Sequence, residues 1–187
     1  MKSRYLVLAA ILSTGSLPLL AQDGMPGGNG VAIKAHATNT ADKAFIRKAT
    51  EGSMTEVEFG KIAVAKSNNP EVKNFGQKMI DDHTMLLDGM KPIAAKRNVT
   101  PPTHIDAQHK AMANRFKRMS PEAFDKAYVK DMVEDHHEDL AEFKKERDAT
   151  KDDELKASVV QALDVIQMHS DMIDGIASKN GIKVAAM

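Results

Sequence analysis

The sequence contains no cysteine and no tryptophan, and aromatic residues make up only 4% of its 187 residues. Without cysteine, the chain cannot form disulfides, thiolate nucleophiles or cysteine-ligated zinc and iron–sulfur sites. Acidic and basic residues balance at 26 each, so no basic field attracts a phosphate backbone, and few rings are present to stack on bases. We therefore expect no nucleic-acid partner, and any bound metal must be held by histidine, carboxylate or methionine. Seven histidines and twelve methionines are present.

The N-terminus has the layout of a secretory signal peptide. Lys2 and Arg4 precede a short apolar run at residues 5–12, and small residues and a proline follow before Ala21. The run as far as Leu20 is shorter than the ~20 apolar residues that a membrane-spanning helix needs. The sequence predicts a signal peptide over residues 1–21 and a periplasmic or secreted mature protein, with no stable membrane insertion after cleavage.

Residues 22–40 are rich in glycine and lack helical periodicity, which predicts a flexible linker. Capping residues and prolines then divide the chain into helices. Thr40 is the expected cap of the first helix, and Thr150 to Asp153 resembles a capping box that opens the last. Long helices are expected at about 41–67, 70–97, 121–148 and 151–178, with a short helix at about 106–118 and a tail at 180–187. No segment shows period-two alternation, so residues 41–179 are predicted to form an all-α domain.

Each long helix carries apolar residues at alternating spacings of three and four, as a bundle core requires. These stripes run from Phe45 to Ala63, from Val72 to Ile93, from Val129 to Phe143 and from Leu155 to Ile176. Four such stripes, with a long crossover between the second and third helices, predict a four-helix bundle.

One residue in each stripe does not suit an apolar core, and the four are Glu56, His83, His136 and His169. Each lies within about five residues of the midpoint of its helix, which is under ~8 Å at 1.5 Å per residue. Mid-helix positions meet in a bundle whichever way each helix runs. The sequence therefore predicts one buried layer of three imidazoles and one carboxylate at half height.

A transition metal ion explains this layer, because imidazole lone pairs bind the cation and a carboxylate offsets its charge. Burying these groups unpaired would cost several kcal/mol. Glu56, His83, His136 and His169 are together a suitable ligand set for iron, zinc, manganese or copper. The alternative is a metal-free cluster in which the histidines hydrogen-bond to Glu56 and to backbone and fix the register of the helices.

Polar residues beside the layer have weaker predicted roles. Glu58 lies about 200° around its helix from Glu56 and is expected to face solvent or a neighbouring helix edge. Asp82 and Asp135 each precede a layer histidine, so each either orients a ligand on a neighbouring helix or is a solvated carboxylate. The remaining histidines are expected at the surface: His36, His104, His109 and His137.

Three methionines, Met79, Met132 and Met172, lie one helical turn from a layer histidine. If the crossover spans the length of the bundle, the second and third long helices run parallel and these side chains stack on one side of the layer. Thioethers favour Cu(I), so a mixed methionine and histidine copper site is one interpretation. Ordinary core packing is the preferred one.

Four separated motifs follow one another along residues 41–179. They are TEVEFGKIA at 55–63, MIDDH at 79–83, FDKAYVKDMVEDH at 124–136 and IQMH at 166–169. They resemble a family of exported bacterial proteins catalogued as domain of unknown function four-one-four-two. The order of helical hairpins, with an inward carboxylate and histidines, also resembles the ferritin-like superfamily. The resemblance implies a ferritin-like bundle outside the cytoplasm and no established activity.

The chain departs from the di-iron members of that superfamily, which carry Glu-x-x-His on two helices. Ile80, Val133 and Ile166 stand three residues before the layer histidines, so two bridging carboxylates are missing. A mononuclear site is therefore favoured over a di-iron centre.

Three hypotheses for the function follow. The first is an exported bundle that binds one transition-metal ion for metal handling or stress protection. The second is an enzyme that performs redox chemistry on oxygen species at the same site, with Tyr128 nearby. The third is a metal-free structural or partner-binding bundle.

Overall fold

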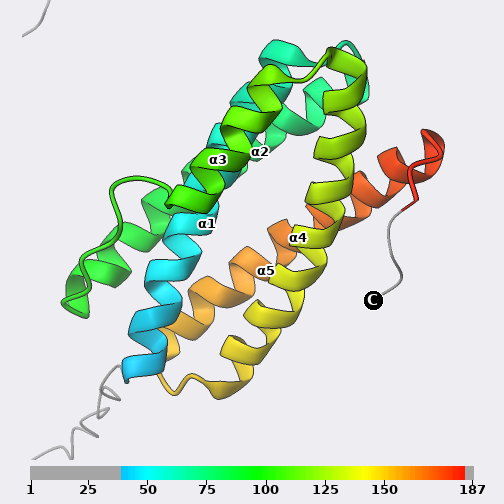
Figure 1. Ribbon diagram of the computed structural model, residues 1–187. Helices are drawn as coiled ribbons and strands as arrows, with labels where there is room; N and C mark the ends of the chain where they lie inside the picture. The colour runs from blue at the N-terminus through cyan, green and yellow to red at the C-terminus, as the bar shows by residue number, and fades with distance from the viewer. Residues whose placement is uncertain (1–38, 184–187) are drawn as a thin grey trace, which may run out of the picture. The chain divides into compact units, whose positions relative to one another are not determined.

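The computed structural model describes residues 39–183, and this part of the chain is helical and contains no strand (Figure 1). Four helices are long and one is short: α1 (Thr40–Lys66), α2 (Pro70–Lys96), α3 (Ala107–Arg118), α4 (Pro121–Ala149) and α5 (Asp153–Lys179). The prediction of an all-α domain is confirmed. The expected signal peptide, His36 and most of the expected linker lie outside the described residues.

The helices begin and end within two residues of the predicted positions, but two caps differ from the prediction. Asn39, and not Thr40, caps α1, and its Oδ1 accepts the backbone N–H of Asp42 at 2.9 Å. Asp152, and not Thr150, caps α5 by accepting the N–H of Leu155 at 3.0 Å. In both cases a short Asn or Asp side chain reaches the N–H three residues further on, which is the geometry that an N-cap requires.

The long helices form two antiparallel hairpins, α1 with α2 and α4 with α5, and the connection that carries α3 joins them (Figure 1). Arg97, at the end of α2, forms a buried salt bridge with Asp152 at the start of α5. At the other end of the bundle, Lys179 pairs with Glu71 at 2.6 Å. The helices α2 and α5 are therefore antiparallel, so α2 and α4 run parallel.

The predicted stripes face inward and form two apolar clusters. One cluster includes Phe75, Tyr128 and Ile173, and the other includes Phe45 and Ile166. Met79, Met132 and Met172 all pack in the first cluster, as expected from their positions. The polar layer lies between the two clusters along every long helix. Among the described helices, none combines the length and hydropathy of a membrane span.

The helices α1 and α2 approach each other closely at a pair of glycines. A Cβ on Gly60 would lie 2.5 Å from the carbonyl oxygen of Gly76, and a Cβ on Gly76 would lie 2.7 Å from the Cβ of Ala63. Both positions must therefore lack a side chain for the backbones to approach this closely. Gly60 is one helical turn from Glu56, so the contact helps to place that carboxylate.

Candidate metal centre

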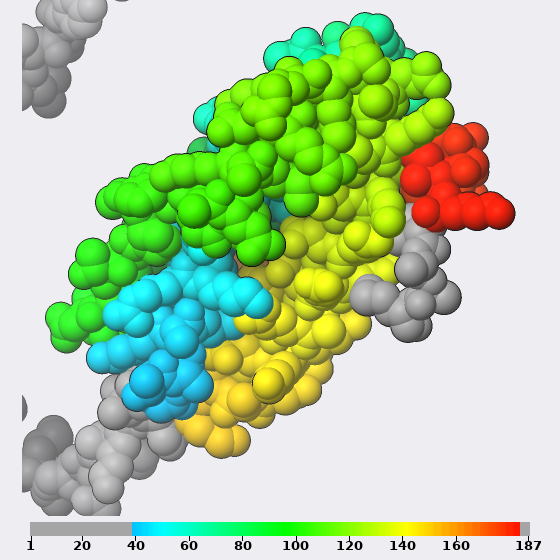
Figure 2. All heavy atoms as spheres, viewed as in Figure 1, coloured from blue at the N-terminus to red at the C-terminus, as the bar shows by residue number. Residues whose placement is uncertain are grey.

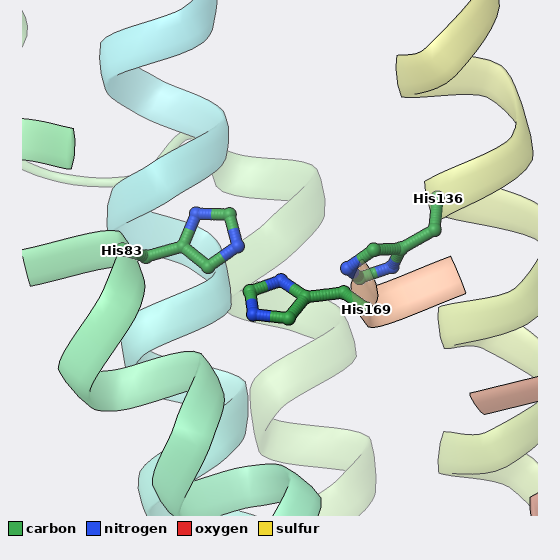
Figure 3. A group of neighbouring side chains, drawn as sticks. All are labelled: His83, His136 and His169. Carbon is green, nitrogen blue, oxygen red and sulfur yellow. The ribbon is translucent and has the colours of Figure 1, made fainter. Parts of the chain in front are cut away.

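Three of the four predicted layer residues meet in the interior of the bundle. His83 on α2, His136 on α4 and His169 on α5 turn their rings toward one another (Figure 3). One ring nitrogen from each lies within 4.8 Å of the other two, and the ring centroids are 5.3–6.4 Å apart. The three side chains are 0–3% exposed, so this group is sealed from bulk solvent on most sides.

Hydrogen bonds determine which nitrogen of two of the rings carries a proton. His136 donates from Nδ1 to the carbonyl oxygen of Met132 at 2.8 Å, and His169 donates from Nε2 to Oδ2 of Asp82 at 2.7 Å. The lone pairs of these neutral rings are therefore on Nε2 of His136 and Nδ1 of His169. Within residues 39–183, these two nitrogens and both nitrogens of His83 are buried without a hydrogen-bond partner. Each ring thus has a buried lone pair available for a ligand.

Asp82 takes the first of the two roles that the sequence allows it, since it orients a histidine on a neighbouring helix. It also pairs with Lys78 at 2.9 Å. Burial raises the pKa of Asp82, but hydrogen bonds from Lys78 and His169 outweigh burial and lower it overall. An ionised Asp82 is the kind of partner that fixes the orientation of a metal-ligating imidazole and increases its basicity.

The three histidines are uncharged at neutral pH. Burial lowers the pKa of His83 well below its usual value, and the proximity of His169 and His136 lowers it further. Burial also lowers the pKa of His136, to about 4. For His169, burial lowers the pKa although Asp82 acts in the opposite direction. Neutral imidazole is the form that binds metals, so no proton has to be displaced at neutral pH.

Glu56 lies in a second cluster that overlaps the first. One ligand atom from each of Glu56, Asp135 and His136 lies within 4.8 Å of the other two, so His136 belongs to both clusters. Glu56 is 2% exposed, and its Oε2 has no hydrogen-bond partner in the described part of the chain. Burial raises the pKa of Glu56 well above its usual value, and the hydrogen bond and negative charge of Asp135 raise it further. Asp135 is thus a direct neighbour of Glu56.

A cavity of about 420 Å³ connects these clusters to the surface. Figure 2 shows the molecule hollowed where α1, the start of α3 and α4 meet. The cavity extends from exposed residues such as Lys48 and Glu138 to the buried Glu56 and His83. Its carboxylates are Glu51, Glu56, Asp106, Asp135, Glu138, Asp139 and Glu142. They outnumber the cationic side chains of the lining, so the cavity favours cations.

Sequence reasoning missed most of this acidic lining, although α4 carries a signal for it. Asp131, Asp135, Glu138 or Asp139, and Glu142 recur at helical spacing and form an acidic stripe beside the stripe of His136. Burial, followed by the charge of Asp135, raises the pKa of Asp139 to about 8 and that of Asp131 to about 6. These shifts show that the carboxylates are crowded and poorly compensated.

The expectation of surface positions fits one of the three described histidines outside the layer. His104 is exposed, whereas His109 and His137 are only partly exposed. His109 lies 3.1 Å from Oε1 of Glu51, and His137 lies 3.0 Å from Oδ2 of Asp174. Packing of α3 against α1 partly covers His109, and packing of α4 against α5 partly covers His137. Each ring gains a carboxylate partner from the neighbouring helix, and residue spacing along a single helix does not reveal such a partner.

Two further residues singled out by sequence are accounted for. Glu58 pairs with Lys117 of α3 at 2.8 Å, so it faces a neighbouring helix as expected. Tyr128 is fully buried, and burial followed by the charge of Glu56 raises its pKa well above the usual value. Its hydroxyl is buried without a hydrogen-bond partner among the described residues.

Comparison with known proteins gives one match. No curated protein matches the chain, and no solved structure matches it. A family model described as "Domain of unknown function (DUF4142)" matches residues 30–176, which include both clusters and all five helices up to Ile176. The match covers most of the sequence, and the chain therefore belongs to this family of proteins with a domain of unknown function.

Proposed function

We propose that the bundle binds one transition-metal ion through His83, His136 and His169, with Glu56 as the neighbouring carboxylate. The proposed role is metal handling or stress protection outside the cytoplasm. One observation carries this: three buried rings face one another, and each has a nitrogen without a hydrogen-bond partner in the described chain. In His136 and His169, the other ring nitrogen carries the proton and donates to an oxygen atom, as is usual for metal-ligating histidines.

The hydrogen bonds give less support to a metal-free cluster. That alternative requires the histidines to hydrogen-bond to Glu56 and to backbone. His136 bonds to the carbonyl oxygen of Met132, but His83 makes no hydrogen bond and Oε2 of Glu56 accepts none. Each buried polar group without a partner costs about 1–3 kcal/mol. A cation bound by the three lone pairs would remove most of this cost, since three of the four ring nitrogens without a partner would gain a bond.

The ligand chemistry favours iron, zinc, manganese or copper(II). Imidazole nitrogens suit these borderline ions, and three of them leave a position for water or a carboxylate. Met79 and Met132 are fully buried in the apolar cluster, so we assign them to core packing and not to the site.

Two broader parts of the proposal concern fold relationship and location. The two antiparallel hairpins joined by a long connection support a ferritin-like arrangement. The basic start, apolar run and small residues before Ala21 support export, so the metal would be bound in the periplasm or the medium.

Elemental analysis of the mature protein, purified from the periplasm without an affinity tag, tests the function. We expect near-stoichiometric metal in the wild type and none in His83→Ala/His136→Ala. The control is His104→Ala/His137→Ala, which removes two histidines outside the layer and should retain the metal. A folded wild-type protein that contains no metal and binds no added iron, copper, zinc or manganese would overturn the proposal.

A further inference from the structure

His136 belongs to two clusters, but it has only one lone pair to offer. Its Nδ1 donates to the carbonyl oxygen of Met132 at 2.8 Å, so only Nε2 can bind a cation. One lone pair binds one ion at a time. The histidine cluster and the cluster of Glu56, Asp135 and His136 are therefore alternative positions for a single ion when His136 is a ligand in both.

The two clusters differ in their access to solvent. Glu56, Asp135 and His83 line the acidic cavity, whereas His136 and His169 are not part of its lining. A cation that enters through the cavity therefore meets the two carboxylates and His83 before it meets His169. At the inner end of the cavity, Oε2 of Glu56 is buried and has no hydrogen-bond partner in the described chain, so it is available to bind the cation.

The charges along this route favour a hydrated divalent cation. Seven carboxylates line the cavity, and Lys48, its one lysine, pairs with Glu142. Such a surface raises the local concentration of cations and their rate of association. Carboxylate oxygens bind partly hydrated ions readily, and imidazole nitrogens hold borderline transition metals more selectively.

We propose that Glu56, Asp135 and His136 form a second cation site, here named the receiving site. It takes a divalent transition-metal cation from the acidic cavity and transfers it to the histidine cluster. This inference rests on the metal-binding function proposed above. The transfer is a ligand exchange: the bonds from Glu56 and Asp135 are replaced by bonds from His83 and His169, while Nε2 of His136 holds the ion. Binding of the ion displaces the proton that the buried carboxyl of Glu56 holds, and a proton from solvent in the cavity returns to Glu56 when the ion moves on. No electron moves, and the charge of the ion does not change.

Cobalt(II) is a suitable probe, because its visible absorption reports the number and kind of its ligands. Metal-free mature protein is mixed with Co²⁺, and binding is followed by stopped-flow absorbance. In Glu56→Gln/Asp135→Asn we expect one Co²⁺ per chain with the final spectrum of the wild type, but association slower by about tenfold or more. Glu138→Gln/Glu142→Gln removes two other cavity carboxylates and is the matched control, expected to load within about threefold of the wild-type rate.

The second arm isolates the receiving site. His83→Ala/His169→Ala removes two ligands of the histidine cluster and leaves the receiving site intact. This variant should bind one Co²⁺ more weakly, with a spectrum that indicates more oxygen ligands. Adding Glu56→Gln and Asp135→Asn to it should abolish binding, while circular dichroism confirms that each variant is folded.

Three outcomes would overturn the receiving site and leave the metal-binding function standing. Glu56→Gln/Asp135→Asn could load as fast as the matched control, or it could lose the ion at equilibrium, which would make Glu56 and Asp135 permanent ligands. His83→Ala/His169→Ala could also bind no Co²⁺. Failure of the wild type to bind any Co²⁺ would instead contradict the metal-binding function itself.

Discussion

At the scale of single residues, hydrogen bonds give the two oriented histidines opposite ligand atoms. His136 is held through Nδ1 and offers Nε2, whereas His169 is held through Nε2 and offers Nδ1. The partners are a backbone carbonyl in one case and Asp82 in the other. Because a carboxylate is charged and a carbonyl is not, the orientation and basicity of His169 depend on a side chain that mutation can change.

Asp82→Asn should weaken metal binding while leaving the three histidines in place. An amide retains an oxygen acceptor but lacks the negative charge that strengthens the bond from His169, so we expect the dissociation constant to rise by about tenfold or more. Competition against a chelator of known affinity measures it. Asp81→Asn is the control, because Asp81 is exposed and accepts its hydrogen bond from Gln77 of the same helix, not from a histidine. Equal affinities of the two variants would contradict the role of Asp82.

A second prediction concerns Glu146, which is 9% exposed near Asp42. Burial, followed by the charge of Asp42, raises the pKa of Glu146 from 4.5 to about 7. Between these values the folded protein holds a proton that the unfolded chain has lost, so stability falls as the pH rises through this window. Glu146→Gln should therefore be more stable than the wild type by about 1–2 kcal/mol at pH 8 and should show no advantage at pH 4.

Denaturant unfolding of the metal-free protein at both pH values checks this prediction. Glu122→Gln, at an exposed position near the start of the same helix, is the control and should not show this pH-dependent gain in stability. A constant difference between Glu146→Gln and the wild type at the two pH values would show that Glu146 does not titrate as described.

At the scale of elements, α1 and α2 owe their close contact to two glycines, and α4 supplies the acidic wall of the cavity. The sequence identifies the helices because capping residues, prolines and apolar spacing are local signals. It misplaces two caps, at Thr40 and Thr150, because several neighbouring side chains are competent to cap. The acidic stripe of α4 is visible in the sequence, but only the packing of α1 against it turns solvated carboxylates into a crowded wall.

Gly76→Ala should destabilise the protein by about 1–3 kcal/mol, because its methyl group would overlap the Cβ of Ala63 and push α1 from α2. The matched control is Gly89→Ala on the same helix, where nothing lies within 4 Å of the added Cβ. That change should stabilise the protein by about 0.5–1 kcal/mol, since alanine is the better helix former. Thermal unfolding compares the two, and destabilisation of similar size in both would exclude close packing as the cause.

At the scale of the whole molecule, the histidine cluster connects the two hairpins. His83 belongs to the first hairpin, whereas His136 and His169 belong to the second. A bound ion would therefore link the hairpins at half height, where the polar layer separates the two apolar clusters. The salt bridge from Arg97 to Asp152 makes a similar connection at one end of the bundle.

Metal loading should accordingly stabilise the whole bundle and not one hairpin alone. At a free metal concentration of about 100 times the dissociation constant, the gain is about 2.7 kcal/mol, or a rise in Tm of roughly 5–10 °C. Hydrogen exchange should slow in both hairpins around the layer. The variant that combines His83→Ala, His169→Ala, Glu56→Gln and Asp135→Asn, and so lacks ligands of both clusters, should show neither effect. Protection confined to α4 and α5 in the wild type would contradict a link between the hairpins.

The sequence by itself determined the helices, their inward faces and the heights at which Glu56 and the three histidines occur. These follow from local caps and from the 3.6-residue period, which depend only on neighbours along the chain. Tertiary structure decided which of these side chains meet. Height along a helix does not specify direction around the bundle, and the packing of α1 against α4 places Glu56 beside Asp135 in its own cluster. It also decided which ring nitrogens are free, because Asp82 reaches His169 only when α2 and α5 lie side by side.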